Sequence, residues 1–129
     1  MNNMIKNMVF VMGLLFSFFC CAQEQSFVSF TPAEFEKLIK EDTTIQLVDV
    51  RRPDEYAAGH LDRAIMIDVS DSSFVAKANL LLDKSQPVAV YCRSGKRSKD
   101  AAKKLVKEGY KVYELDTGYL GWINRLNEQ

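Results

Sequence analysis

The feature that most constrains this chain is an apolar, β-branched run that passes directly into a polar loop and then into a helical stretch. The run covers residues 87–91, the loop begins at Cys92, and helical periodicity follows Ser98. Similar short runs alternate with helical stretches elsewhere, without internal repeats or low-complexity tracts. This alternation predicts an α/β fold in which helices cover both faces of a central, mainly parallel sheet. A chain of 129 residues fits one such domain.

The same patterning sets approximate element boundaries. Strands are expected at residues 45–50, 64–67, 87–91 and 111–115. Helices are expected at residues 32–39, 53–59, 74–82, 99–108 and 119–126. Thr31 and Glu34 have the spacing of a capping box, Ser98 is expected to cap the helix that follows it, and Gly109 is expected to end that helix. Inward packing is expected for Leu80, Leu81, Leu82 and Trp122.

The first 22 residues have the pattern of a secretory signal peptide. A short polar start with Lys6 is followed by an apolar run from Met8 to Phe19, which is shorter than the roughly 20 residues of a membrane-spanning helix. Cleavage after Ala22 would leave residues 23–129 as the mature domain, and lipidation of Cys20 or Cys21 is the other route. We therefore expect an exported protein, either periplasmic or lipid-anchored to the cell envelope, with a retained anchor as the alternative.

Charge and cysteine content narrow the chemistry of the mature domain. The chain has 17 basic and 17 acidic residues, and removing Lys6 with the leader leaves 16 against 17. This balance gives no indication of a nucleic-acid partner. Of the three cysteines, only Cys92 remains after cleavage at Ala22. A single thiol in an exported protein is a candidate reactive group.

Cys92 stands where a predicted parallel strand ends and a helix is about to begin, which is where open α/β sheets bind ligands. Gly95 permits a tight turn that can aim several backbone N–H groups at an anion. Arg93, Lys96 and Arg97 bring cations to the same loop, and the following helix adds its positive end. These features favour the thiolate, so we expect a nucleophile that needs no histidine base. The alternative is a buried structural cysteine.

Three segments together resemble the rhodanese homology domains, specifically the short single-domain sulfurtransferases. They are residues 47–61, residues 90–98 and residues 109–122. Within them stand the Asp49-Val50-Arg51 start, the Cys92 loop and the final strand leading to Gly118. The sequence departs from the usual family pattern at residues 61–64, which lack the proline and glycine before Ala64. It also departs at residues 116–118, which carry one glycine where two are common.

The resemblance implies sulfur transfer. Family members take a sulfur atom from a donor such as thiosulfate onto the active-site cysteine, and pass it to a thiol or cyanide acceptor. Here Cys92 would carry the persulfide and Arg97 would attract the anionic donor. No cofactor and no metal is implied. The implied substrate-binding residues are Arg93, Ser94, Gly95, Lys96, Arg97 and Ser98. The implied structural supports are Asp49, Arg51, Glu55 and His60, with Arg51 expected to pair with Glu55.

Two other functions share these motifs. A related cysteine phosphatase would place one residue more between cysteine and arginine than the four, Arg93 to Lys96, that separate Cys92 from Arg97 here. A phosphoryl group needs room for three equatorial oxygens, so the shorter loop favours sulfur transfer. A non-enzymatic sulfur carrier or protein-binding module is the other alternative. A protein that supplies or takes the sulfur is a further class of partner, and a membrane would be contacted only through a lipid anchor.

Overall fold

The computed structural model describes residues 26–129, which form a five-stranded parallel sheet and five helices. The strands are β1 Val28–Phe30, β2 Gln46–Asp49, β3 Ile65–Met66, β4 Val88–Tyr91 and β5 Val112–Leu115. The helices are α1 Pro32–Glu41, α2 Pro53–Ala58, α3 Phe74–Leu81, α4 Lys96–Lys107 and α5 Gly118–Asn127. The predicted leader, residues 1–22, lies outside the described residues, and so do its expected processing positions.

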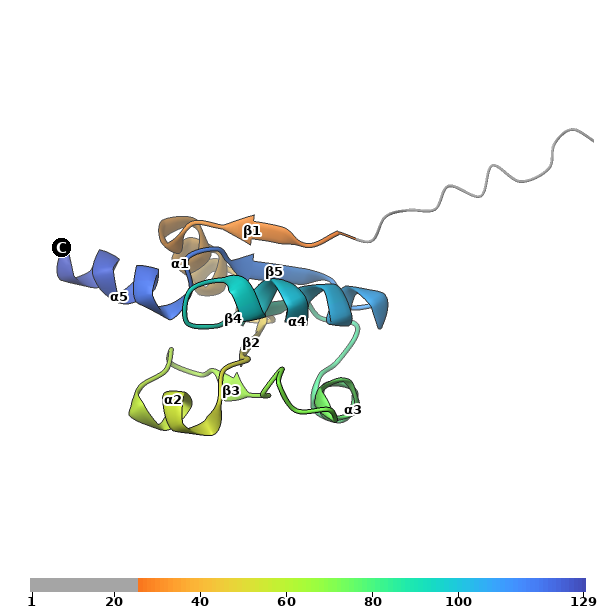
Figure 1. Ribbon diagram of the computed structural model, residues 1–129. Helices are drawn as coiled ribbons and strands as arrows, with labels where there is room; N and C mark the ends of the chain where they lie inside the picture. The colour runs from red at the N-terminus through yellow and green to blue at the C-terminus, as the bar shows by residue number, and fades with distance from the viewer. Residues whose placement is uncertain (1–25) are drawn as a thin grey trace, which may run out of the picture.

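The strand order is β1-β5-β4-β2-β3, so β4 occupies the middle of the sheet (Figure 1). Helices α3 and α4 pack on one face, where Phe74, Ala78 and Leu105 join the core. Helices α1 and α5 pack on the other face, around Phe35 and Trp122. The α/β class and the helices on both faces are therefore confirmed. Because all the strands are parallel, the segments that follow them meet at one edge of the sheet.

The first helix begins as its sequence predicts. The backbone N–H of Glu34 donates to the Thr31 hydroxyl over 3.3 Å, and the Thr31 N–H donates to the Glu34 carboxylate over 3.1 Å. This reciprocal capping box satisfies two N–H groups that the first turn of a helix leaves without partners. The helix continues to Glu41 instead of ending near Ile39. Edge strand β1, which pairs with β5, was not predicted from the sequence.

The expected packing of two leucines on α3 is wrong. Leu80 is 85% exposed and Leu81 is 57% exposed, whereas Leu82 is 8% exposed. The buried stripe of this helix runs through Phe74 and Ala78, which are four residues apart, and reaches Leu82 at the same spacing. Leu80 and Leu81 therefore lie off the stripe and face solvent.

The predicted start of α4 is also wrong. The helix begins at Lys96 rather than Lys99, and its cap is Gly95, whose φ of 101° lies in the left-handed region. Ser98 is a buried residue of the first turn and does not cap the helix. A glycine can make the turn that starts the helix earlier, and this turn moves Ser98 into the site. Gly109 follows the end of the helix with φ of 98°, as expected for a terminating glycine.

None of the helices described between residues 26 and 129 has the length and the apolar character that a membrane span requires.

Candidate active site

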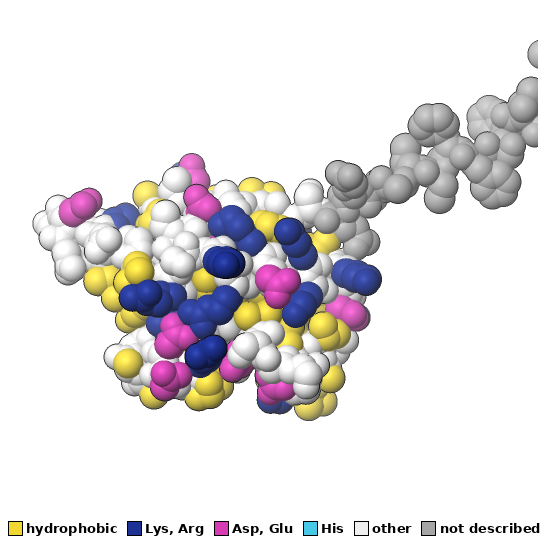
Figure 2. All heavy atoms as spheres, viewed as in Figure 1, with side chains coloured by type: hydrophobic (Ala, Val, Ile, Leu, Met, Phe, Trp, Pro, Cys, Tyr) yellow, Lys and Arg dark blue, Asp and Glu magenta, His cyan; other side chains and the backbone are white. Residues whose placement is uncertain are grey.

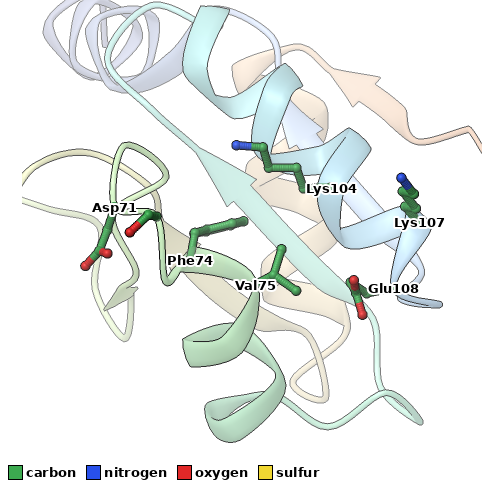
Figure 3. Close-up of a pocket in the computed structure, with 7 residues that line it drawn as sticks. Asp71, Phe74, Val75, Lys104, Lys107 and Glu108 are labelled. Carbon is green, nitrogen blue, oxygen red and sulfur yellow. The ribbon is translucent and has the colours of Figure 1, made fainter.

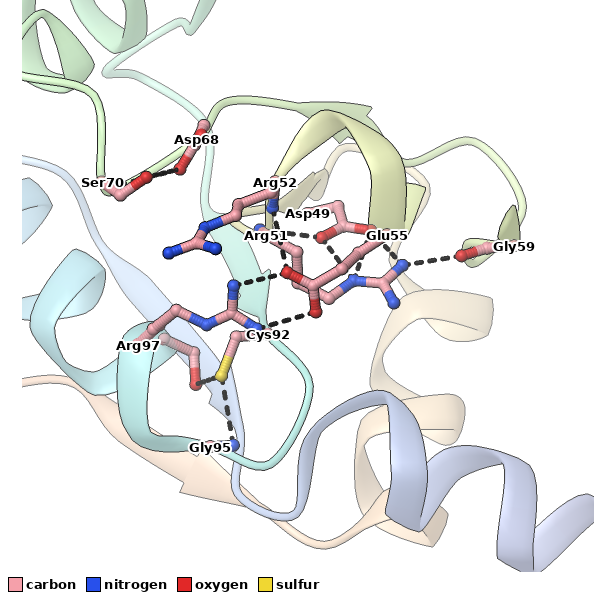
Figure 4. A network of polar contacts seen from close by, with 11 residues as sticks. Asp49, Arg51, Arg52, Glu55, Gly59, Asp68, Ser70, Cys92, Gly95 and Arg97 are labelled. Carbon is pink, nitrogen blue, oxygen red and sulfur yellow. Dashed lines mark hydrogen bonds and ion pairs between the residues drawn. The ribbon is translucent and has the colours of Figure 1, made fainter. Parts of the chain in front are cut away.

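The Cys92 thiol lies at the carboxyl end of the middle strand, inside the loop that joins β4 to α4. The backbone N–H of Gly95 donates to Cys92 Sγ over 3.1 Å (Figure 4). The Ser98 hydroxyl lies 3.4 Å from the same sulfur. Cys92 is only 1% exposed. The loop therefore wraps its amides around the sulfur, as the glycine and the early helix start require.

These contacts change the acidity of the thiol. Burial raises the pKa of Cys92, because a charged sulfur loses its hydration. Hydrogen bonds to the sulfur from Ser98, Gly95 and Ser94 outweigh burial, so the pKa of Cys92 is lowered from its ordinary value. A thiolate favoured in this way is a nucleophile without a histidine base.

The start of α5 holds the loop from outside. The N–H of Tyr119 donates to the carbonyl of Cys92 over 2.8 Å, and the N–H of Leu120 donates to the carbonyl of Arg93 over 3.0 Å. Gly118 has φ of 64°, and a Cβ there would lie 2.5 Å from the backbone of Arg93. Because these carbonyls bond outward to α5, the loop is free to turn N–H groups inward.

Arg97 and Glu55 form a two-pronged ion pair beside the thiol. The two guanidinium nitrogens of Arg97 donate to the two carboxylate oxygens of Glu55 over 2.6 and 2.9 Å (Figure 4). Hydrogen bonding from Arg97 lowers the pKa of Glu55 to about 2, although partial burial acts in the opposite direction. The expected pairing of Arg51 with Glu55 is therefore wrong. Glu55 instead fixes Arg97, the cation expected to bind the donor.

Arg51 is held by Asp49, two residues before it on the same chain segment. Its Nε and one terminal nitrogen donate to the Asp49 carboxylate over 2.9 and 2.7 Å, and the terminal nitrogen also donates to the carbonyl of Gly59 over 2.7 Å. The guanidinium carbon lies 4.4 Å from the centre of the Tyr119 ring. Arg51 thus ties the end of β2 to α2 and to the start of α5.

The remaining loop residues differ in exposure. Arg93, Ser94 and Lys96 are exposed, whereas Gly95 and Ser98 are buried. Figure 2 shows Lys and Arg side chains gathered over α4, with Asp and Glu side chains among them. Arg93 and Lys96 therefore place two exposed cations on the loop that contains Cys92.

His60 lies apart from this arrangement. Its ring stacks on Tyr56 of α2 with centroids 3.7 Å apart, and its Nδ1 lies 2.9 Å from the Tyr56 carbonyl. Within residues 26–129, no group of three or more histidine, cysteine, aspartate or glutamate side chains is arranged to hold a metal ion.

A pocket of about 310 Å³ lies between α3 and α4 (Figure 3). Its lining includes Phe74, Val75 and Lys104, and it contains no residue of the Cys92 loop. It is therefore separate from the sulfur site.

Glu114 of β5 is the site residue that sequence reasoning missed. Its side chain is fully buried and accepts a hydrogen bond from Ser98 Oγ over 2.7 Å. Ser29 Oγ donates to its other oxygen over 2.7 Å, and Lys99 Nζ lies 3.2 Å away. The available signal was a glutamate in the middle of a predicted core strand, because charged residues are rarely buried without partners.

Within residues 26–129, the one cysteine lies in an amide-lined loop at a strand end of an α/β domain, which is an arrangement typical of proteins that use a thiolate nucleophile. The family model described as Rhodanese-like domain matches residues 31–125. The chain therefore belongs to the rhodanese-like family. At the level of the family, this membership supports sulfurtransferase activity.

Two curated relatives illustrate the range of the family. Over 93 residues the chain is 37% identical to the thiosulfate sulfurtransferase GlpE of Pseudomonas fluorescens, covering 70% of this chain and 81% of that protein. Over 126 residues it is 32% identical to the tRNA uridine(34) hydroxylase of Pelagibacter ubique. That match covers 97% of this chain but only 40% of the relative, so this chain spans less than half of its length.

A solved structure shows the same fold. The rhodanese-related protein of Thermoplasma volcanium superposes with a TM-score of 0.66 at 26% identity, covering 77% of this chain and 93% of that one.

Proposed function

We propose that this protein moves sulfane sulfur from an anionic donor such as thiosulfate to a thiol or cyanide acceptor through a persulfide on Cys92. The observation that carries the proposal is the sulfur of Cys92 at 3.1 Å from the Gly95 N–H, inside a loop that lowers the thiol pKa. The family supports the reaction class, and the GlpE relative supports thiosulfate as the donor.

The reaction consists of two displacements. The Cys92 thiolate attacks the outer sulfur of thiosulfate, a bond forms between the two sulfurs, and sulfite leaves with the electron pair of the broken bond. The negative charge then lies on the outer persulfide sulfur, where the loop amides and the positive end of α4 stabilise it. The acceptor attacks this outer sulfur, the sulfur–sulfur bond breaks, and the Cys92 thiolate is restored. Atoms and electrons balance in both displacements without a redox cofactor or a metal.

The neighbours of Cys92 have separate roles in this scheme. The N–H groups of the loop from Arg93 to Ser98 surround the transferred sulfur. Arg97, oriented by Glu55, meets the sulfonate end of the donor, and exposed Arg93 and Lys96 draw the anion to the loop.

Mass spectrometry of the intact protein tests the proposal directly. After incubation with thiosulfate and removal of excess donor, the protein should gain the mass of one sulfur atom and lose it again on addition of cyanide, with thiocyanate released. Cys92→Ser is the matched blank, because Cys92 is the one free cysteine in the described residues. A wild-type protein that takes up no sulfur, or a Cys92→Ser variant that does, would refute it. Sulfur uptake without release to cyanide or to a thiol would instead indicate a non-enzymatic sulfur carrier.

We also propose that residues 1–22 direct export, on the sequence pattern alone. Cell fractionation with N-terminal analysis tests this proposal. A mature chain starting near Gln23, or at a lipidated Cys20 or Cys21, supports it, whereas cytoplasmic protein that keeps Met1 contradicts it.

A further inference from the structure

A continuous hydrogen-bonded chain runs from the thiol into the interior of the protein. The Cys92 thiol lies 3.4 Å from Ser98 Oγ, and Ser98 Oγ lies 2.7 Å from the Glu114 carboxylate. Cys92 is 1% exposed, and Ser98 and Glu114 are fully buried. Glu114 therefore has a direct route to the nucleophile that does not pass through solvent.

The Ser98 hydroxyl has a single proton, and this proton couples the charge of Cys92 to the charge of Glu114. Ser98 cannot donate to the Cys92 thiolate and to the Glu114 carboxylate at the same time. When the thiol is neutral, it donates to Ser98 and Ser98 donates to Glu114. When the sulfur is charged, Ser98 must donate to it, and the bond to a charged Glu114 is lost. Two buried anions joined through one hydroxyl are unfavourable, so the two groups compete for one charge.

We propose that Glu114 accepts the proton of the Cys92 thiol through the Ser98 hydroxyl. The S–H bond breaks as the proton passes to Ser98 Oγ, and the former Ser98 proton forms an O–H bond with Glu114 Oε2. The net charge of the chain is unchanged, with the negative charge moved from the carboxylate to the sulfur. Glu114 touches no substrate, and it is a positioning residue that acts through Ser98.

Lys99 is the charged group that faces Glu114 from α4. Its Nζ lies 3.2 Å from the Glu114 carboxylate and 2.9 Å from Asp116, which follows β5. The ammonium thus keeps a carboxylate partner after Glu114 takes the proton. From β1, Ser29 donates to the other Glu114 oxygen over 2.7 Å and can equally accept from or donate to a neutral carboxyl group.

On the sulfur side, the facing cation is Arg97 of α4, which is already paired with Glu55 of α2. Its charge favours the thiolate, so it supports transfer of the proton toward Glu114. The proton is then held in the protein while the thiolate attacks and while the persulfide exists, and it returns to Cys92 Sγ through Ser98 after the acceptor has removed the outer sulfur and restored the thiolate.

The inference rests on the proposed role of Cys92 as nucleophile, and it is tested without any sulfur donor. The rate of Cys92 alkylation by iodoacetamide is measured against pH. If Cys92 and Glu114 share a proton, the wild type shows a pH-independent plateau between the two titration steps of the pair. Glu114→Gln and Ser98→Ala should each remove the plateau, so that the rate falls about tenfold for each pH unit below the thiol titration.

Ser29→Ala is the matched control, because it removes a side-chain partner of Glu114 that has no path to the sulfur. It should keep the plateau. A wild type that titrates in one simple step, or a plateau that survives in Glu114→Gln, overturns the proposal. A simple downward shift of the thiol titration in Glu114→Gln, without a plateau in the wild type, also overturns it, because Glu114 would then be only an electrostatic neighbour.

A second measurement uses the wild type alone, in case Glu114→Gln does not fold. In protein labelled with ¹³C, the Glu114 carboxyl carbon and the Cys92 Cβ should titrate in the same two steps, and separate titrations overturn the relay. If the shared titration and the plateau are present but thiosulfate adds no sulfur, the relay stands and the proposed sulfur transfer fails.

Discussion

Gly118 connects the folding of the C-terminal helix to the shape of the active-site loop. Its φ of 64° is a left-handed conformation, and a Cβ at this position would lie 2.5 Å from the carbonyl carbon and oxygen of Arg93. The next two residues donate N–H groups to the carbonyls of Cys92 and Arg93. Gly118→Ala should therefore strain the backbone and also push the Cys92 loop away from α5.

Gly109 provides the matched comparison. It also has a left-handed φ, 98°, but a Cβ there would meet nothing within 4 Å. Gly109→Ala should cost about 1–2 kcal/mol of unfolding free energy from the backbone alone. Gly118→Ala should cost that amount and about 1–3 kcal/mol more from overpacking against the loop. For a domain of this size, each kcal/mol lowers Tm by about 4–8 °C.

Thermal unfolding and thiosulfate-to-cyanide transfer should be measured on both variants at a temperature where both are folded. We expect Gly109→Ala to keep transfer near the wild-type rate and Gly118→Ala to lose most of it. The reasoning is refuted if the two variants are equally stable and equally active. It is also refuted if Gly118→Ala loses stability but keeps full transfer, because the contact with α5 would not then shape the loop.

Three further predictions concern Arg97, its ion pair with Glu55 and the length of the Cys92 loop. Arg97→Ala should weaken thiosulfate use about tenfold or more, since charge-assisted contacts contribute about 1.5–3 kcal/mol, and added salt should slow the wild type in steady-state assays. Because the folded-state pKa of Glu55 is lowered from 4.5 to about 2, its ion pair stabilises the fold above pH 4.5. The stability difference between wild type and Glu55→Gln in urea melts should therefore shrink as the pH falls from 4.5 toward 2, and a constant difference would contradict this pairing. Inserting a glycine after Gly95 should reduce sulfur transfer, and the unmodified loop should hydrolyse aryl phosphates negligibly; Cys92-dependent phosphate release above sulfur transfer would reverse the assignment.

Local signals in the sequence predict the frame of the site. The apolar run before Cys92, the glycine at position 95 and the capping box at Thr31 each act within a few residues, so the corresponding strand, loop and helix could be expected. The early start of α4 could not, because Ser98 resembles a cap by type and its burial depends on Glu114 in another strand.

Pairings between residues far apart in the sequence account for the other differences between the predicted and the observed structure. Glu55 and Arg97 are 42 positions apart, and nothing near Glu55 distinguishes Arg97 from the closer Arg51 as its partner. Asp49 takes Arg51 instead, because a chain turn brings the two side chains together after β2. Strand β1 is short and lies at the sheet edge, so its pairing with β5 is decided by the tertiary fold.

One departure from the usual family pattern places a large side chain on a left-handed backbone. Arg63 stands where a glycine is usual, yet it keeps a left-handed φ of 67°, and its guanidinium donates to the carbonyl of Ile39 over 3.2 Å. The side chain thus contributes a tie to α1 that a glycine could not make, at the cost of backbone strain.

Thr117, at the other departure, lies on a backbone without left-handed strain. Its φ is −92°, so the backbone there does not require a glycine, whereas the adjacent Gly118 does. The Thr117 hydroxyl would lie 1.9 Å from a Cβ at position 121, which makes Gly121 the residue that accommodates the threonine. A Cβ at Gly95 would lie 1.9 Å from the carbonyl oxygen of Asp116, so the β5–α5 turn contacts the Cys92 loop at Gly95 as well as at Gly118. The two left-handed glycines therefore fix the loop around the sulfur, and a side chain at position 121 would require a smaller residue than threonine at position 117.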